Sequence, residues 1–359
     1  MMERKWEIIE LGKLVKILDK FRRPVTKKDR AKGSYPYYGA TGIQDYVDSY
    51  IFDGRYLLVG EDGAKWMSGD KSAFIIEGKS WVNNHAHVLK VGNSLIDKYL
   101  EFFLIHKDLS EYITGAIIPK LTQQSLKSIP IPVPPLPVQA RIVDELDCLQ
   151  GILSKKRQQL AEYHSLAQAI FHQMFGDPVV NEKGWEVKRL GEITNNLDSK
   201  RKPITKKDRK EGIYPYYGAS GITDYVEGFI FDGNYLLVSE DGANLLTRTA
   251  PIAFLALGKI WINNHVHVMQ CDNIASHTYI QYHLNQITLK KYISGSAQPK
   301  LNQEKLNSIP IPFPPLPLQQ SFANRIAVIN NQCESLNKSI HEMETLLATR
   351  MDKLLNMDC

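Results

Sequence analysis

The sequence predicts an α+β protein in which two similar mixed α/β domains are separated by two long antiparallel coiled-coil helices. Two observations support this fold class. The second half of the chain repeats the first, and each half ends in a stretch whose apolar residues have the alternating spacing of a coiled-coil seam. A repeat this long indicates a duplicated domain rather than a solenoid.

The first long helix is predicted over Val138–Phe175. Ten seam positions, alternately four and three residues apart, run from Ile142 to Met174, and only Lys156 among them is neither apolar nor small. Pro137 stands before the first turn, where a helix tolerates proline, and Gly176-Asp177-Pro178 is a stop signal. A seam this narrow requires a partner helix.

The repeat supplies that partner in a second predicted helix, Leu318–Asn356, whose seam runs from Phe322 to Leu354. A compact domain with neighbouring termini lies between the two helices, so the second helix must run back along the first. We therefore expect an antiparallel pair with the domains at opposite ends, related by a pseudo-two-fold axis.

The predicted boundaries follow from the repeat, in which Trp185 lies 179 residues after Trp6. The four segments are a first domain (1–137), a central helix (138–177), a second domain (178–317) and a C-terminal helix (318–359). Strands are expected over Tyr50–Val59, Ser72–Ile76 and Trp81–Val88, which are rich in aromatic and β-branched residues. Short helices are expected over Leu95–Leu109 and Ile274–Leu289, and an extended segment over Ile129–Pro137.

Composition permits a nucleic-acid partner, because the net charge is +5. The four cysteines contain no CxxC pair, which argues against a zinc site or a disulfide framework and fits a reducing cytosol. The charged N-terminus lacks the apolar core of a signal peptide, and no run of about 18 apolar residues predicts a membrane span.

Two basic clusters are the first candidates for a binding site, since Lys and Arg neutralise phosphates. They comprise Arg22, Arg23, Lys27, Lys28, Arg30 and Lys32, and Lys200, Arg201, Lys202, Lys206, Lys207, Arg209 and Lys210. Each precedes a tyrosine-rich run, which contains Tyr37 and Tyr38 in the first copy and Tyr216 and Tyr217 in the second. Tyrosine hydroxyls add contacts to backbone or bases. The alternative is a solvated charged loop beside a core aromatic cluster.

The second candidate is Asn83-Asn84-His85-Ala86-His87, repeated as Asn263-Asn264-His265-Val266-His267. On a strand, Asn83, His85 and His87 would share one face and Asn84 would point to the other. Asn pairs bidentately with adenine, and His donates or accepts at base edges or phosphates. A metal site is a weaker interpretation, because two histidines need further ligands. A satisfied polar network inside the domain is the third.

The third candidate is the loop Gly115–Leu121, repeated as Gly295–Leu301, which presents Lys120 or Lys300 to a groove or a phosphate. Alternatively, Pro-Lys-Leu is only a junction between a loop and a strand.

Catalytic interpretations are poorly supported. Glu61, Asp62 and Lys65 suggest a metal-dependent nuclease, but the second copy has Asn244 in place of Lys65. The Asn/Asp-Pro-Pro-Tyr/Phe motif of amino-methyltransferases is absent, as are the glycine-rich phosphate-binding motifs and the Gly-x-Ser-x-Gly motif. We therefore predict no catalytic residue, no metal site and no cofactor of the chain's own.

These motifs, in this order and duplicated, resemble the specificity (S) subunits of type I restriction-modification systems. The resemblance rests on Trp-x-x-x-x-Leu-Gly at the start of each half, Tyr-x-Tyr-Tyr-Gly-Ala-x-Gly-Ile, Asn-Asn-His, Gly-x-x-x-Pro-Lys-Leu, and Ile-Pro-x-Pro-Pro-Leu-Pro-x-Gln before a long helix. It covers essentially the whole chain. One departure is that Ala140-Arg141-Ile142 becomes Gln320-Ser321-Phe322 in the second helix.

The resemblance implies two target-recognition domains that each read one half of a split site in double-stranded DNA. The helices would set the distance between the half-sites and dock two modification subunits, which carry S-adenosylmethionine and flip adenine. Restriction subunits would add translocation and cleavage with ATP and magnesium. The chain itself would be a non-catalytic, cytoplasmic DNA-binding subunit without a membrane partner.

Because the two domains are near-copies, we expect a nearly palindromic interrupted site. Differences between the half-sites should arise where the copies diverge most, at residues 65–80 against 244–260 and 116–118 against 296–298. The predicted DNA contacts are Arg22, Arg23, Lys27, Lys28, Arg30, Tyr37, Tyr38, Asn83, Asn84, His85, Lys120, Arg201, Lys202, Lys206, Lys207, Arg209, Tyr216, Tyr217, Asn263, Asn264, His265 and Lys300. The competing hypotheses are a stand-alone DNA-binding regulator and a self-contained nuclease or methyltransferase.

Overall fold

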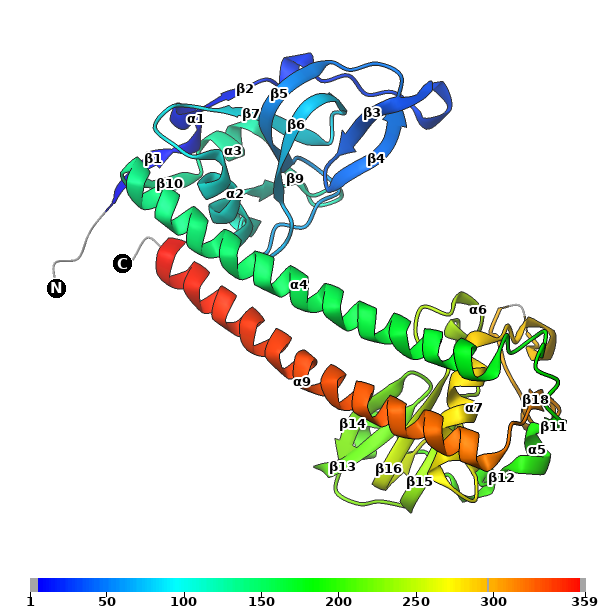
Figure 1. Cartoon of the computed structure of the whole chain (residues 1–359). Coiled ribbons are helices and arrows are strands. Elements are labelled where there is room, and N and C mark those ends of the chain that lie inside the picture. Colours follow the sequence, from blue (N-terminus) through cyan, green and yellow to red (C-terminus); the bar gives the residue numbers. More distant parts are fainter. Residues whose placement is uncertain (1–5, 296, 356–359) are drawn as a thin grey trace. The chain divides into compact units, whose positions relative to one another are not determined.

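The structure, a computed structural model, describes residues 6–295 and 297–355 of the 359-residue chain. It divides into two compact units (Figure 1). The first unit contains the residues up to Arg157 and those from Lys338 onward, and the second unit is Gln158–Asn337. Each unit therefore holds one sheet domain and a part of each long helix. The predicted helix end at Asn356 and the loop residue Ser296 lie outside the described residues.

The first unit is built on a six-stranded sheet of order β2-β7-β5-β6-β3-β4. Neighbouring strands are antiparallel except β3 and β6, which are parallel. The strands are β2 (Val15–Ile17), β3 (Lys32–Gly39), β4 (Gly42–Val47), β5 (Phe52–Gly60), β6 (Ala73–Val82) and β7 (Ala86–Val91). The strand expected over Trp81–Val88 is wrong, because a turn at residues 83–85 divides it between β6 and β7.

Smaller elements surround this sheet. β1 (Glu7–Glu10) pairs with β10 (Pro130–Val133), and β8 (Ile113–Thr114) pairs with β9 (Lys120–Leu121). The helices are α1 (Leu11–Leu14), α2 (Asp97–His106) and α3 (Gln123–Lys127), with 3-10 turns at Asp19–Phe21, Lys27–Asp29 and Ser110–Tyr112. α2 is the helix expected over Leu95–Leu109, and it is shorter than predicted at both ends.

The long helix α4 (Leu136–Phe175) begins two residues before the predicted start at Val138. Pro137 therefore lies in the first turn, where its missing N–H has no helical acceptor to lose. Buried Gln139 anchors this end, because its Nε2 donates to the carbonyl oxygens of Ser94 (3.0 Å) and Pro134 (2.7 Å). The glutamine of the Pro-x-Gln motif thus fixes the helix to its domain.

Within the first unit, the start of α4 packs against the end of α9 (Leu316–Leu355), so the two segments are antiparallel. Ile142 and Leu146 share a buried cluster with Met351 and Leu355. Polar pairs set the register, which the sequence left open. Lys156 Nζ donates to Ser339 Oγ (2.9 Å), Arg157 pairs with Glu344 (2.6 Å), and Arg350 pairs with Glu145.

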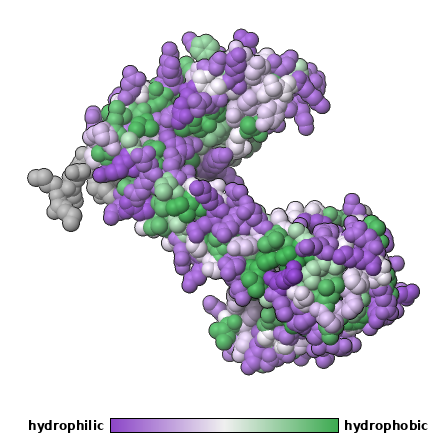
Figure 2. All heavy atoms as spheres, viewed as in Figure 1, coloured by the Kyte–Doolittle hydropathy of each residue, from purple (hydrophilic) through white to green (hydrophobic). Residues whose placement is uncertain are grey.

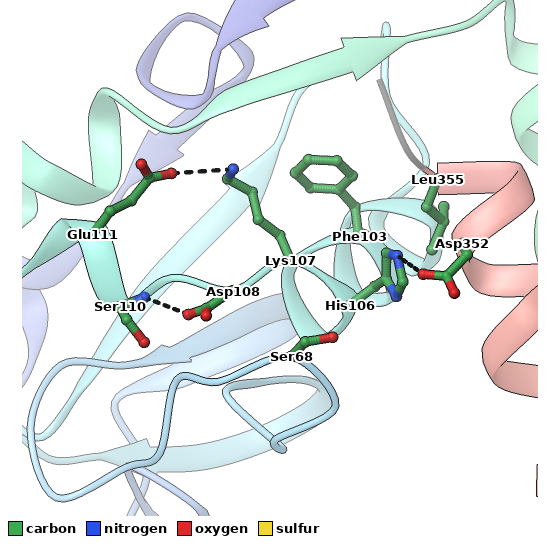
Figure 3. Close-up of a pocket in the computed structure, with 9 residues that line it drawn as sticks. All are labelled: Ser68, Phe103, His106, Lys107, Asp108, Ser110, Glu111, Asp352 and Leu355. Carbon is green, nitrogen blue, oxygen red and sulfur yellow. Dashed lines mark hydrogen bonds and ion pairs between the residues drawn. The ribbon is translucent and has the colours of Figure 1, made fainter. Parts of the chain in front are cut away.

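The end of α9 also meets α2 across a cavity of about 630 Å³, in which His106 Nε2 lies 3.2 Å from Asp352 (Figure 3). Lys107 pairs with Glu111 at 3.3 Å, and Asp108 accepts the Ser110 N–H at 2.8 Å. The charged side chains of these three pairs bind within the cavity lining, so none of them is left free to act as a catalytic group.

The second unit repeats this plan with a sheet of order β12-β17-β15-β16-β13-β14. Its strands are β12 (Asn195–Asn196), β13 (Glu211–Gly218), β14 (Gly221–Val226), β15 (Phe231–Ser239), β16 (Ala253–Ile262) and β17 (Val266–Gln270). β11 (Val187–Arg189) pairs with β18 (Pro310–Pro312). The short helices are α5 (Leu190–Ile193), α6 (Asn244–Thr247), α7 (Ile274–Gln286) and α8 (Gln303–Asn307), with 3-10 turns at Asp198–Lys200, Lys206–Asp208 and Lys290–Tyr292.

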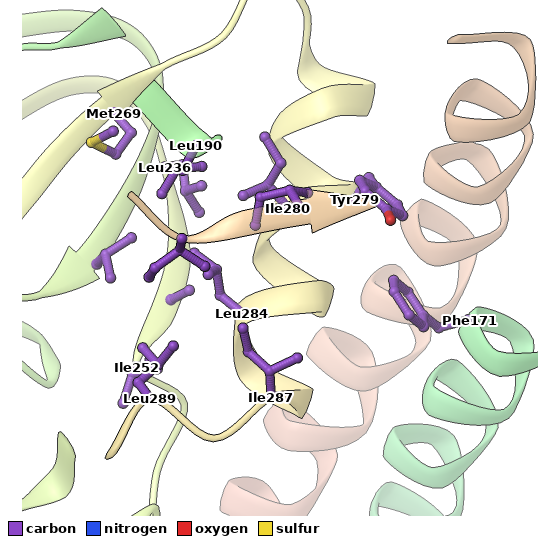
Figure 4. Close-up of a cluster of buried hydrophobic side chains, with 14 of the residues drawn as sticks. Phe171, Leu190, Leu236, Ile252, Met269, Tyr279, Ile280, Leu284, Ile287 and Leu289 are labelled. Carbon is purple, nitrogen blue, oxygen red and sulfur yellow. The ribbon is translucent and has the colours of Figure 1, made fainter. Parts of the chain in front are cut away.

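An aromatic core joins the end of α4 to the start of α9 in the second unit (Figure 4). The ring of Phe171 stacks on Tyr279 of α7 (centroids 5.6 Å apart) and meets Phe322 of α9 edge-on at 5.6 Å. Phe175 lies 5.2 Å from Phe322. The end of α4 and the start of α9 are therefore antiparallel here too. Phe322 is fully buried, although Gln320-Ser321-Phe322 departs from the corresponding Ala-Arg-Ile of the first long helix.

Figure 2 shows hydrophilic side chains over most of the drawn face of each unit. Among the residues that the structure describes, none of the helices is both long and apolar enough to cross a bilayer.

Phe171→Ala should lower the free energy of unfolding of the second unit by about 3–5 kcal/mol, because it leaves a cavity among three aromatic rings. The matched control is Leu166→Ala on the same helix, whose side chain is 47% exposed and whose loss should cost below about 0.5 kcal/mol. Thermal and denaturant unfolding of both variants would measure this, and equal midpoints would contradict the packing.

Candidate nucleic-acid interface

The three candidate segments of the first half meet around Glu61, which follows the end of β5. The Glu61 N–H donates to the His85 carbonyl oxygen (2.8 Å), and the Leu121 N–H donates to the Glu61 carbonyl oxygen (2.8 Å). The Glu61 carboxylate binds Arg22 and, at 2.7 Å, Lys120. The basic segment, the Asn-Asn-His segment and the Pro-Lys-Leu loop are thus held at one place.

Arg22 is a structural cation rather than a free phosphate ligand. Its guanidinium binds the carboxylates of Glu61 and Asp19 and donates to the carbonyl oxygens of Ala86 (2.8 Å) and Asn84 (3.3 Å). The side chain is only 13% exposed. A DNA contact by Arg22 stays a prediction, and in this structure protein acceptors occupy its donors.

His87 is buried on β7 and is held from both sides. Its Nδ1 lies 2.6 Å from Asp19 Oδ2, and its Nε2 lies 2.8 Å from the Leu121 carbonyl oxygen. Asp19, Glu61 and His87 are close enough to hold a metal ion, as are Asp198, Glu240 and His267 among the described residues. Arg22 and Lys120 already supply the positive charge in the first cluster, so it fits an ion-pair network better than a metal site.

The network shifts the pKa values of its carboxyl groups. Burial alone would raise the pKa of Asp19, but hydrogen bonding and charge from His87, the Val88 N–H and Arg22 hold that pKa below its usual value. Burial likewise opposes ionisation of Glu61, and hydrogen bonds from Lys120 and Arg22 lower its pKa overall. Both groups are therefore stabilised as carboxylates.

The Asn-Asn-His segment forms a turn between β6 and β7, so the prediction that it lies on a strand is wrong. Asn83 closes the turn by accepting the His85 N–H at its Oδ1 (2.8 Å). Asn83 is 2% exposed and its Nδ2 donates to Gln44 Oε1 (3.2 Å), so it has a structural role here, and its base contact stays a prediction. Asn84 and His85 stay at the surface, where His85 binds Asp62.

Tyr37 and Arg30 also have structural roles. Tyr37 is 1% exposed and its hydroxyl accepts the Val25 N–H at 3.0 Å. The Arg30 guanidinium lies 4.1 Å from the centre of the Tyr37 ring and pairs with Asp45 at 3.2 Å. They fix the basic segment to the sheet, as do Tyr216 and Arg209 in the second unit. This outcome favours the alternative of a charged loop beside core aromatics.

Tyr38 is half-buried beside Phe74, with ring centroids 5.9 Å apart, and burial raises its pKa. Its counterpart Tyr217 stacks on Phe254 at 6.1 Å, and burial raises its pKa too. Both tyrosine rings therefore pack mainly against other side chains of their own sheet.

Of the cations predicted to contact DNA in this basic segment, Arg23, Lys27 and Lys28 remain exposed. Within the described residues no side-chain hydrogen bond or ion pair is recorded for them, nor for Lys202, Lys206 and Lys207 in the second unit. The backbone beneath Arg23 is fixed, because Trp81 Nε1 donates to its carbonyl oxygen at 2.6 Å. We call these three cations, with Asn84, His85 and the 42% exposed Lys120, the basic corner of the first unit.

The second unit builds the same corner. Glu240 binds Arg201 at 2.6 Å and Lys300 at 3.1 Å, and its N–H donates to the His265 carbonyl oxygen at 2.9 Å. His267 lies between Asp198 (2.5 Å) and the Leu301 carbonyl oxygen (2.7 Å). Asn263 closes its turn onto His265, and Asn264 is exposed. Arg201 and Asn263 therefore have the same structural roles as Arg22 and Asn83, and their DNA contacts likewise stay predictions.

One difference lies at the edge of each corner. Thr223 replaces Gln44: the Gln44 Oε1 accepts from the Asn83 amide, whereas the Thr223 hydroxyl donates to the Tyr216 carbonyl oxygen (3.2 Å). Asp19 and Asp198 are not among the predicted site residues. The available signal was that Asp-x-x-Arg recurs at Asp19–Arg22 and Asp198–Arg201.

Arg22→Met should destabilise the first unit by about 3–5 kcal/mol, because it leaves Glu61 and Asp19 buried without their guanidinium. Arg23→Met is the matched control, since its exposed side chain has no recorded partner, and it should change stability by below about 0.5 kcal/mol. Chemical denaturation separates the two, and equal effects would refute the distinction.

Acid should destabilise both units in a definite pH range. Asp19, Glu61, Asp198 and Glu240 have pKa values below their ordinary ones, so ionisation favours the folded state. Their contribution is fully present above the unfolded values of about 3.9 and 4.3 and is lost as pH falls through the folded values. Melting temperatures recorded from pH 6 down to acid should fall, and the fall should be shallower in Glu61→Gln. An unchanged slope in that variant would contradict this assignment.

Comparisons with known proteins agree with this architecture. Residues 3–163 and 182–345 each match the type I restriction modification DNA specificity domain. A Haemophilus influenzae protein assigned as a type I restriction enzyme specificity subunit is 27% identical over 353 residues, covering 92% of this chain and 88% of that protein. The MjaVIII specificity subunit of Methanocaldococcus jannaschii is 23% identical over 396 residues, covering 98% and 92%.

The fold is similar to the crystal structure of a type I S subunit from Mycoplasma genitalium. The TM-score is 0.65 at 15% identity, with 99% of this chain and 98% of that chain covered. The two domain matches together span most of the sequence. The chain therefore belongs to the family of type I restriction-modification DNA specificity subunits, whose members confer specificity and are not themselves catalytic.

Proposed function

We propose that this chain reads a bipartite site in double-stranded DNA on behalf of a type I restriction-modification complex. Each sheet domain binds one half-site through its basic corner. The observation that carries the proposal is that the corner is built twice from the same residue types, with exposed cations beside an exposed Asn-His pair. Family membership supports DNA as the ligand.

The contacts divide by exposure. Arg23, Lys27 and Lys28 have no recorded acceptor within the described protein, so they are the proposed phosphate ligands. Asn84 and His85 are exposed and polar, and they are the proposed base-edge contacts. Lys202, Lys206, Lys207, Asn264 and His265 have the same roles in the second unit. The buried network positions both sets.

The proposed site is interrupted and nearly palindromic, because near-identical readers are attached to antiparallel helices. Differences between half-sites arise at residues 65–80 against 244–260 and at 116–118 against 296–298. Residues 244–260 of the second unit include the helix α6, whereas residues 65–80 of the first unit form no helix. The corner itself also differs, because Thr223 stands in place of Gln44.

The partners are two modification subunits and, in the complete system, restriction subunits. The exposed faces of α4 and α9, including Lys155 and the Arg157–Glu344 pair, are the proposed docking surfaces. S-adenosylmethionine, ATP and magnesium belong to these partner subunits in this proposal. The complex works in the cytoplasm, where it meets DNA.

Sequencing of modified adenines tests the function. A host that expresses the chain with its modification subunits should methylate an interrupted motif with closely similar half-sites, and a host that lacks only this chain should not. Unrelated half-sites would refute the near-palindrome, and methylation independent of the chain would refute the function. Exchanging residues 65–80 with 244–260 should alter the motif, and an unchanged motif would exclude that region.

A further inference from the structure

The loop between β8 and β9 presents two isoleucines to solvent. Ile117 is 94% exposed and Ile118 is 68% exposed, and Ile117 is the most exposed large apolar side chain in the described part of the chain. Burying a large apolar side chain is favourable, so leaving two adjacent ones in water is unfavourable. A contact that covers them would recover this energy.

The loop has a defined conformation. Ile113 pairs with Leu121 and Thr114 with Lys120 at its base. Gly115 has a φ of +92°, and a Cβ there would lie 2.4 Å from the Ile118 carbonyl oxygen, so only glycine permits this tight loop. The isoleucines are thus carried by a compact loop.

The base of this loop belongs to the basic corner. Lys120 ends the loop and pairs with Glu61 at 2.7 Å, and it bridges to Asp62 through the backbone. The apolar tip is therefore attached to the same basic corner that contains the exposed cations. This juxtaposition of apolar and cationic groups is typical of proteins that insert aliphatic side chains between base pairs.

The second unit keeps the loop and changes its tip. Gly295 has a φ of +81°, and a Cβ there would again lie 2.4 Å from the carbonyl oxygen of the third residue on, Gln298. Ala297 and Gln298 stand where the first unit has Ile117 and Ile118. The two loops thus share this glycine-dependent turn and differ in the chemistry of the tip.

We propose that Ile117 and Ile118 form an apolar wedge that partly unstacks a base step in the half-site bound by the first unit, and that the second unit has no such wedge. This rests on the proposed function, in which the corner binds DNA. Unstacking costs least at pyrimidine–purine steps, so the wedge would add a sequence preference without any hydrogen bond to a base. The two near-identical readers would then deform DNA unequally.

The double substitution Ile117→Ala, Ile118→Gln tests this by giving the first loop the second loop's tip. Both side chains are exposed, so the fold should be unaffected. The chain with its modification subunits is bound to duplexes of its own site, with 2-aminopurine placed at successive steps but never at the methylated adenine. The native complex should raise the fluorescence at one step, and the variant should lose this signal and bind the duplex about tenfold more weakly. The reverse change, Ala297→Ile with Gln298→Ile, should create a signal in the other half-site.

Each other outcome is decisive. Specific DNA binding by the native complex without any fluorescence rise would overturn the wedge and leave the proposed function standing. Absence of any specific DNA binding would overturn the proposed function itself. If the variant keeps the signal but loses its modification subunits on size-exclusion chromatography, the tip is a protein contact and the wedge is wrong.

Discussion

The buried carboxylate of Glu61 is the constraint on which the architecture of the first unit's corner depends. Taking a carboxylate out of water costs several kcal/mol, and the protein must return that energy through cations and hydrogen bonds. Arg22 and Lys120 come from segments far apart in the sequence. Satisfying one charge therefore brings the basic segment, the Asn-Asn-His turn and the Pro-Lys-Leu loop together, and Glu240 does the same in the second unit.

The sequence predicted the fold class and the long helices well, because a heptad seam extends over many turns and averages out local exceptions. The predicted start of α4 is two residues late only because the prediction assigns Pro137 to the position before the helix. Lys156 interrupts the seam without breaking it, since Ser339 supplies an acceptor on the opposite helix. Long periodic elements are thus the most predictable part of this molecule.

The site was less predictable, because short polar motifs do not reveal which atoms are already bonded. Asn83 was expected on a strand, yet its side chain closes a turn. Arg22 and Arg23 are adjacent and identical in chemistry, but the Arg22 side chain has acceptors from four residues, whereas none is recorded for the Arg23 side chain among the described residues. Only the three-dimensional structure separates a cation that holds the domain together from one that is available to a ligand.

The duplication provides an internal comparison of what each reader needs. The ion network is retained in both units, while positions around it vary. Phe103 in the core of the first unit corresponds to His283 in the second, where burial lowers the pKa to about 4 and neither ring nitrogen has a partner within the described protein. The second core thus accommodates an imidazole that burial keeps uncharged, whereas neither corner has lost a charge from its network.

The ion network of each corner is therefore a stronger constraint on the sequence than a single position in the core. One core accommodates a buried, uncharged imidazole in place of a phenyl ring. Loss of one partner of Glu61 or Glu240 would instead release the loops that carry the exposed cations and the Asn-His pair, so it would alter the geometry of recognition itself. The exposed groups and the loop tips are under no such restraint. Recognition can therefore diverge between the two readers while the framework that positions it stays the same.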